Sequence, residues 1–212
     1  MRNNWAQKVY NEIIEANSLE DVNRIFNGSR YLTKIEIGAI IGEMIGTYDL
    51  SMTDKLKIAL TSEKFKENSD CVSEDGEPII NCIIKAYFNN IKNGNTTNKT
   101  MLKAFLFDKN INYNWNIKNS KNETPFHVIV DNCEYLKDTD YDLFFKKEII
   151  ETINPLTKDI NSKNIIQLFK EKNKLKHKNK IKNILKNFYD VVEDQTIYIK
   201  EDAYDITENE VE

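Results

Sequence analysis

The chain has 212 residues, of which 40% are apolar and 30% charged, and its net charge is −4. This composition is typical of a soluble globular protein and excludes a wholly disordered chain. No run approaches the roughly 20 apolar residues of a membrane span. Charged residues also interrupt the N-terminal segment, so we expect neither a membrane span nor a cleaved secretory signal.

Only 6 glycines and 3 prolines interrupt the chain, which favours helices joined by polar turns. The 3 cysteines are odd in number and lack paired spacing, which indicates a reducing compartment. We therefore expect a cytoplasmic protein, and translocation into a host cell stays open as an alternative.

Residues 1–72 contain two predicted helical pairs. Apolar residues recur at helical spacing over residues 4–16, and a second helix follows the capping residue Ser18. Thr33 and Ser51 open the two helices of the second pair. The polar segment 67–77 contains Asp75-Gly76 and predicts a short loop or hairpin.

The segment Thr124-Pro125-Phe126-His127 has the pattern of a helix start. Thr124 can cap the helix, and Pro125 suits the first helical position, where its missing N–H costs nothing. Segments that begin at Gly76, Asn122 and Ser162 fit one frame, with starts 46 and 40 residues apart. A second apolar stripe follows each one: Leu102, Phe105 and Leu106; Leu143, Phe144, Ile149 and Ile150; Ile181, Ile184, Leu185 and Phe188.

With Phe for Leu and Ile129 for Ala, this start matches the Thr-Pro-Leu-His-x-Ala pattern, and the chain resembles the ankyrin-repeat family over residues 73–189. The resemblance implies an all-α solenoid of stacked helical hairpins. Residues 1–72 would be divergent repeats or a cap, and residues 190–212 an acidic tail. The spacing exceeds the ideal unit of about 33 residues, which predicts lengthened loops at 91–100 and 133–139. A HEAT-like array or an irregular bundle is the alternative.

His127 is flanked by Glu123 and Asp131, four residues away on either side. Such a group could serve acid–base chemistry or bind a metal. The resemblance instead implies a structural histidine whose ring hydrogen-bonds backbone between repeats.

The remaining candidates for chemistry are weak. Cys71, Cys82 and Cys133 lack the short pairwise spacing of zinc sites, and there is no glycine-rich phosphate loop or catalytic motif. The acids Asp138, Asp140 and Asp142 predict a solvated helix start. We expect no enzymatic activity, no cofactor, no metal and no small-molecule substrate.

Charge is segregated near the C-terminus. Residues 163–187 hold nine lysines and one acid, whereas residues 190–212 hold nine acids and one lysine. We expect the lysines to coat a terminal helix that turns Ile181, Leu185 and Phe188 inward. The tail would fold back over this helix or be recognised by another protein. The alternative is binding of nucleic acid or an anionic surface through Lys170–Lys182.

The resemblance implies a protein–protein interaction scaffold that holds another protein against its hairpin tips and first helices. The partner's identity and the setting, whether bacterial effector, toxin-immunity protein or internal adaptor, stay open. Trp115 suits an interface anchor or, alternatively, packing beneath a hairpin. The candidate partner-binding residues are Asp75, Glu77, Trp115, Asn116, Lys118, Lys158, Asp159 and Lys163.

The nucleic-acid alternative makes its own prediction. Binding through the lysine-rich segment would weaken steeply with salt and vanish when Lys174, Lys176, Lys178 and Lys180 are changed to Glu, because released counterions drive such binding. Filter binding to duplex DNA across a salt series measures both effects. Absent or salt-insensitive binding would exclude this alternative.

Overall fold

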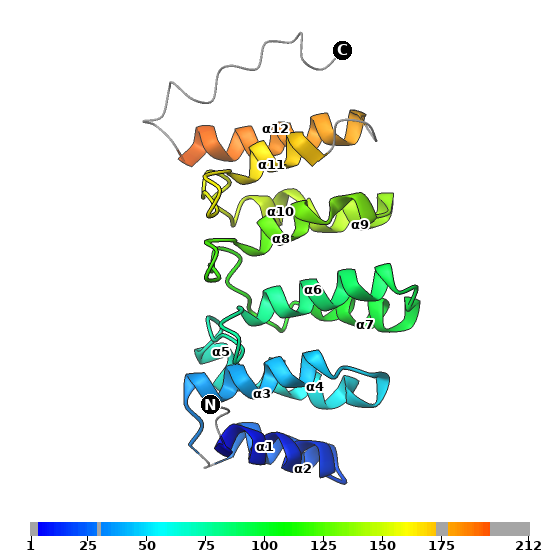
Figure 1. The fold of residues 1–212 in the computed structure, drawn as a ribbon, viewed down its shortest axis with the longest axis vertical. Coiled ribbons are helices and arrows are strands. Elements are labelled where there is room, and N and C mark those ends of the chain that lie inside the picture. Colours follow the sequence, from blue (N-terminus) through cyan, green and yellow to red (C-terminus); the bar gives the residue numbers. More distant parts are fainter. Residues whose placement is uncertain (1–3, 29–30, 173–177, 196–212) are drawn as a thin grey trace. The chain divides into compact units, whose positions relative to one another are not determined.

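The computed structural model describes residues 4–28, 31–172 and 178–195 (Figure 1). Regular structure in these residues is helical, with two isolated β-bridges and no strand, which confirms the all-α prediction. Two compact units divide the chain, residues 1–120 and 121–212. This division falls inside the segment 73–189 that the sequence grouped together.

The first unit is built from three helical pairs. Its helices are α1 (Asn4–Glu15), α2 (Leu19–Asn27), α3 (Lys34–Gly46), the 3-10 helix η1 (Leu50–Met52), α4 (Thr53–Thr61), α5 (Glu63–Glu67), α6 (Ile79–Lys92) and α7 (Thr96–Leu106).

The first helices of these pairs lie side by side in chain order, since α3 contacts both α1 and α6 (Figure 1). Of the second helices, α2 contacts α4. Fully buried side chains such as Ile13, Phe26, Ile41 and Phe65 fill the space between them. Because one short hairpin buries little apolar surface, each pair gains its core from its neighbours.

Two glycines in α3 let a neighbouring segment approach the helix closely. A Cβ atom at Gly38 would lie 1.9 Å from the carbonyl oxygen of Val72, and one at Gly42 would lie 2.6 Å from Cβ of Ser73. The backbone that precedes α6 therefore rests directly on α3.

The second unit contains α8 (Pro125–Asp131), the 3-10 helix η2 (Cys133–Tyr135), α9 (Asp138–Phe144), α10 (Lys147–Ile150), α11 (Ile165–Lys172) and α12 (Lys178–Gln195). Within it, α8 contacts α11 and α10 contacts α12. An aromatic cluster forms the core. The Phe145 ring lies 5.1 Å from Phe169 and 6.0 Å from Phe126, and Phe188 joins all three.

The predicted lengthened loop at 91–100 is wrong. Helix α6 continues to Lys92, and only Asn93, Gly94 and Asn95 separate it from α7. Gly94 reverses the chain with φ +71°, and the Asn95 side chain then caps α7 by accepting from the Asn98 N–H. The segment 133–139 is also partly helical, since it holds η2 and the start of α9.

Two predicted second helices are broken. Ser62 accepts from the Phe65 N–H, so α5 begins anew after α4. Phe145 and Lys146 separate α9 from α10, and the Phe145 ring joins the aromatic core.

The acidic segment begins as helix, because α12 extends through Asp190 to Gln195 and buries Val191 and Val192. Phe188 points inward as predicted, whereas Leu185 is only half-buried and Ile184 beside it is buried instead. The structure does not describe the side chain of Ile181, for which an inward placement was predicted. The rest of the acidic tail, residues 196–212, also lies outside the described residues.

We expect Gly38→Ala to lower the free energy of unfolding by about 1–3 kcal/mol, because the new methyl group must displace backbone. Gly46 ends the same helix and a Cβ there would meet nothing within 4 Å. Gly46→Ala should therefore change stability by no more than about 0.5 kcal/mol. Urea unfolding of both variants measures the difference, and equal effects would refute the close approach.

Candidate functional site

Three turns of the same backbone form precede α6, α8 and α11. These tip turns span residues 74–76, 120–122 and 160–162. Each ends on a left-handed residue, with φ +74° at Gly76, +58° at Asn122 and +62° at Ser162, and a helix begins three residues later in every case. The frame predicted from the sequence, with starts 46 and 40 residues apart, is confirmed.

The first and third tip turns share their hydrogen bonds. The Ser73 N–H donates to the Glu77 carbonyl (2.8 Å), and the Asp159 N–H donates to the Lys163 carbonyl (2.9 Å). The Ser73 hydroxyl and the Asp159 carboxylate then accept from the backbone N–H of those same partners, at 3.2 and 2.9 Å. One isolated β-bridge closes each hairpin.

The Asn-Ser-Lys-Asn string shared by residues 119–122 and 161–164 is not in structural register. Its left-handed residue is the fourth in the first copy, Asn122, and the second in the later copy, Ser162. The frame of helix starts is therefore a better guide to equivalence than identical letters.

The helix starts reuse one capping arrangement. Thr33 and Glu36 form a reciprocal capping box at α3, and Asn164 and Gln167 exchange the equivalent bonds at α11 (3.0 and 2.9 Å). Helix α3 thus shares the capping arrangement of α8 and α11, although the sequence suggested only a helical rhythm in residues 1–72.

The two predicted site residues of the first tip turn differ in exposure. Asp75 is exposed at the tip. Glu77 was expected to be exposed, yet its side chain is only 18% exposed. Its carboxylate accepts from Asn81 (2.8 Å) and Asn119 (3.2 Å) and pairs with Lys85. Glu77 is thus occupied in holding α6 and residue 119 together.

Trp115 is half-buried and packs edge-on against Tyr113, with ring centroids 6.5 Å apart. Tyr113 in turn packs against Phe65 at 6.2 Å. This contact corresponds to the predicted alternative, packing beneath a hairpin, while part of the indole stays accessible. Asn116 and Lys118 beside it are exposed.

In the third hairpin, Lys158 is exposed, whereas Asp159 and Lys163 have intramolecular partners. The Asp159 carboxylate accepts from the Asn161 N–H (2.9 Å) and the Lys163 N–H. The Lys163 ammonium pairs with Glu171, and this hydrogen bond raises its pKa. These two side chains build the hairpin rather than project freely from it.

Ile160 was missed by the sequence analysis. Its side chain is 64% exposed at the first position of the third tip turn, and its N–H donates to the Lys121 carbonyl (2.9 Å). Ile160 lies two residues before the left-handed residue Ser162, and the equivalent positions of the other two turns are polar, Glu74 and Ser120. An apolar residue at this otherwise polar position was the signal that could have identified it.

His127 is 1% exposed at the start of α8. Its Nδ1 accepts from the Thr124 N–H (3.2 Å) and lies 2.8 Å from the Thr124 hydroxyl. Since a backbone N–H can only donate, Nε2 carries the ring proton and faces the Lys163 carbonyl at 3.4 Å. The histidine therefore has a structural role, since it links the start of α8 to the backbone of the hairpin before α11.

Burial disfavours the charged, reactive form of the other side chains considered for chemistry. Burial raises the pKa of Cys71 to about 12 and of Cys82 to about 11, so both thiols are protonated at neutral pH. Asp140, predicted to be solvated, is buried at 2% exposure. Within the described ranges, no His, Cys, Asp and Glu residues cluster to hold a metal ion, and no helix is long and apolar enough to cross a membrane.

Part of the lysine-rich segment is engaged within the second unit. Lys163 pairs with Glu171, and Lys172 lies 3.7 Å from Asp131. Lys182 and Lys186 are exposed on α12. The side chains of residues 173–181 fall outside the described set.

Comparison with models of known protein families gives no match for this chain, and comparison with curated protein sequences gives none either.

Burial lowers the pKa of His127, against the opposing effect of its bond to Lys163. The unfolded chain therefore binds a proton that the folded chain resists, so stability is full above about pH 6.5 and falls as the pH drops below it. We expect His127→Gln to reduce the loss of unfolding free energy between about pH 7.5 and about pH 5. Urea unfolding across this range measures it.

His177→Gln is the matched control, because it removes the one other histidine of the chain. An unchanged pH dependence in His127→Gln, or an equal change in the control, would contradict the assignment.

Proposed function

We propose that this chain is an ankyrin-like repeat scaffold that binds another protein through its tip turns and the first helices of its pairs. The proposal rests chiefly on one observation: the same left-handed turn recurs three times, each time three residues before a helix. A recurring turn and cap of this kind is expected where one structural unit is repeated.

The side chains at the tips suit recognition of a protein. Asp75, Lys118 and Lys158 present charges of both signs, and Ile160 adds an exposed aliphatic group. Exposed apolar groups ringed by polar ones are typical of protein-binding surfaces. The turns behind them are closed by backbone hydrogen bonds, so the tips lose little conformational freedom on binding.

The first helices supply the second part of the proposed surface. In the first unit, α1, α3 and α6 lie next to one another, and the turn at 74–76 stands beside α3. Repeat scaffolds use extended surfaces of this type for partners. Three kinds of partner fit this surface: a host protein, a toxin or a protein of the same cell. Identification of the captured partner distinguishes them.

Photo-crosslinking in the native cellular context tests the proposal. A benzophenone-bearing residue is placed at Asp75, at Ile160 or at Glu20, which is exposed on the second helix α2. We expect the same protein to be crosslinked from both tip positions and not from Glu20. A partner crosslinked equally from Glu20, or none from the tips, would contradict the proposed surface.

Ile160→Ser gives an independent measurement with the captured partner. Because Ile160 is largely exposed, the substitution should leave the unfolding free energy nearly unchanged. As an anchor it should weaken binding about ten-fold or more. Isothermal titration calorimetry compares the two forms, and Leu19→Ser, at an exposed position of the second helix α2, is the matched control.

A further inference from the structure

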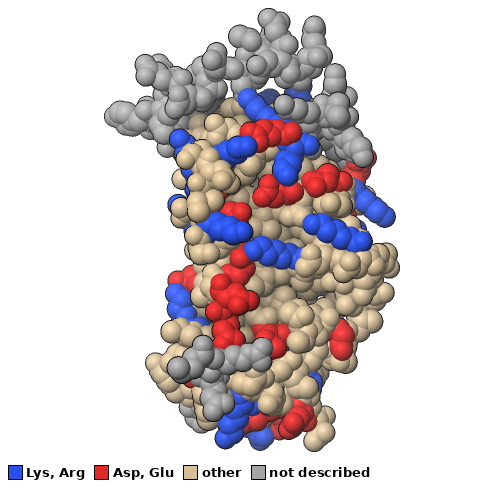
Figure 2. Space-filling view, viewed as in Figure 1, with Lys and Arg blue, Asp and Glu red and all other residues tan. Residues whose placement is uncertain are grey.

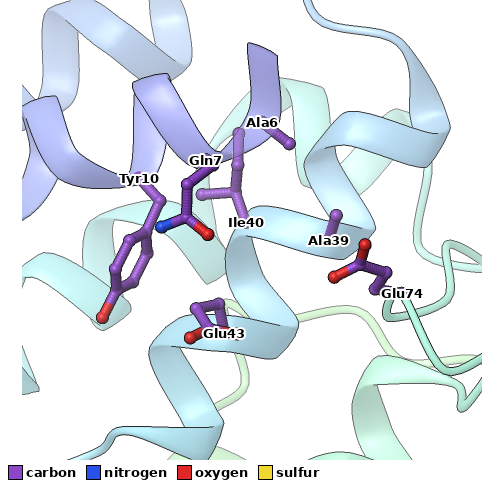
Figure 3. A pocket seen from close by; sticks show the side chains of 7 residues that line it. All are labelled: Ala6, Gln7, Tyr10, Ala39, Ile40, Glu43 and Glu74. Carbon is purple, nitrogen blue, oxygen red and sulfur yellow. The ribbon is translucent and has the colours of Figure 1, made fainter. Parts of the chain in front are cut away.

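The first unit has a small recess between α1, α3 and the first tip turn (Figure 3). Ala6, Ala39 and Ile40 form its apolar floor, and the polar rim is made by Gln7, Tyr10, Glu43 and Glu74. The volume is about 20 Å³, which admits the end of one side chain. Pockets for small molecules span about 300–1,000 Å³.

The two carboxylates of the rim, half-buried at Glu43 and exposed at Glu74, have no partner among the residues that the structure describes. Neither Glu43 nor Glu74 has a side-chain hydrogen bond or ion pair within the part of the chain that the structure describes. Glu43 is half-buried, and a half-buried carboxylate without a cation is costly to desolvate further. By contrast, the nearby acids Asp70 and Glu77 are paired with Lys34 and Lys85.

The rest of the rim is already fixed. The Tyr10 hydroxyl is hydrogen-bonded to that of Thr47 (2.9 Å), and the Gln7 amide donates to Asn11 (3.2 Å). Figure 2 shows acidic side chains gathered between α3 and the start of α6. Since Asp70 and Glu77 in this region are paired with lysines, Glu43 and Glu74 are the carboxylates that favour a cation at the recess.

An apolar contact lies along the same helix. Ile35, Ala39 and Glu43 follow one another at four-residue spacing, so they share one face of α3. Ile35 is 72% exposed. Eight residues of helix place it about 12 Å from Glu43, a distance that an extended peptide covers in about three or four residues.

We propose that this recess receives a lysine or arginine side chain of the protein partner, and that an apolar residue about three or four positions away contacts Ile35. This inference rests on the proposed function and specifies the chemistry of the segment that is bound. An ammonium or guanidinium group between Glu43 and Glu74 supplies the missing charge, and its aliphatic stem lies on Ala39 and Ile40.

A selection from a library of random peptides displayed on phage, with the full chain as target, tests the proposal. We expect the selected peptides to share a basic residue with an apolar residue three or four positions away. A selection that yields no binder, or binders without a basic residue, would overturn it.

The strongest peptide is then synthesised in its selected form and with the basic residue replaced by glutamine. Fluorescence anisotropy measures both peptides against the original chain and the double variant Glu43→Gln, Glu74→Gln. Each change should weaken binding about ten-fold, and the two together by little more, because both remove the same contact. Additive losses would overturn the proposal.

Three controls keep the outcomes separate. Glu20→Gln removes an exposed acid elsewhere and should leave the affinity unchanged. Peptide binding that survives the double variant but is lost in Ile160→Ser would overturn the recess and still support the tip surface. Self-association of the chain in sedimentation velocity that disappears in the double variant would overturn the proposal in favour of a second copy as occupant.

Discussion

The left-handed residue that ends each tip turn fixes where the next helix begins and in which direction the chain enters it. At Gly76, Asn122 and Ser162 the chain reverses and is committed to start a helix three residues later. Asparagine and serine adopt this conformation at some cost, which surrounding hydrogen bonds must offset. The paired backbone bonds at Ser73 and Asp159 supply that support in the first and third turns.

Close contacts hold the tip turns against neighbouring segments of their own unit. Gly38 and Gly42 let the backbone at Val72 and Ser73 rest on α3, so the first tip turn is held against a helix rather than projecting alone. In the second unit, the bond from Ile160 to Lys121 and the ring of His127 link the segment before α8 to the hairpin before α11. Contacts of this kind hold the backbone of each tip turn in one conformation.

The acidic residues in and near the tip turns are of two kinds, those engaged by donors within the protein and those that are not. Glu77 and Asp159 satisfy backbone or side-chain donors and stabilise the hairpins. Asp75, Glu43 and Glu74 have no such duty within the described residues. Glu77 lies only two and three residues from Asp75 and Glu74 along the chain, yet its carboxylate is engaged within the protein, whereas theirs have no partner among the described residues.

The sequence by itself determined the all-α class and the starts of α6, α8 and α11, because capping residues and helical periodicity are local signals. The short connection at 93–95 and the break at Ser62 follow from local caps, which periodicity alone did not reveal. The break at Phe145 and the helical start of the acidic segment were decided by tertiary packing. The same holds for the burial of Glu77, the exposure of Ile160 and the recess at Glu43. These features depend on which residues meet across segments distant in sequence, and periodicity carries no information on that.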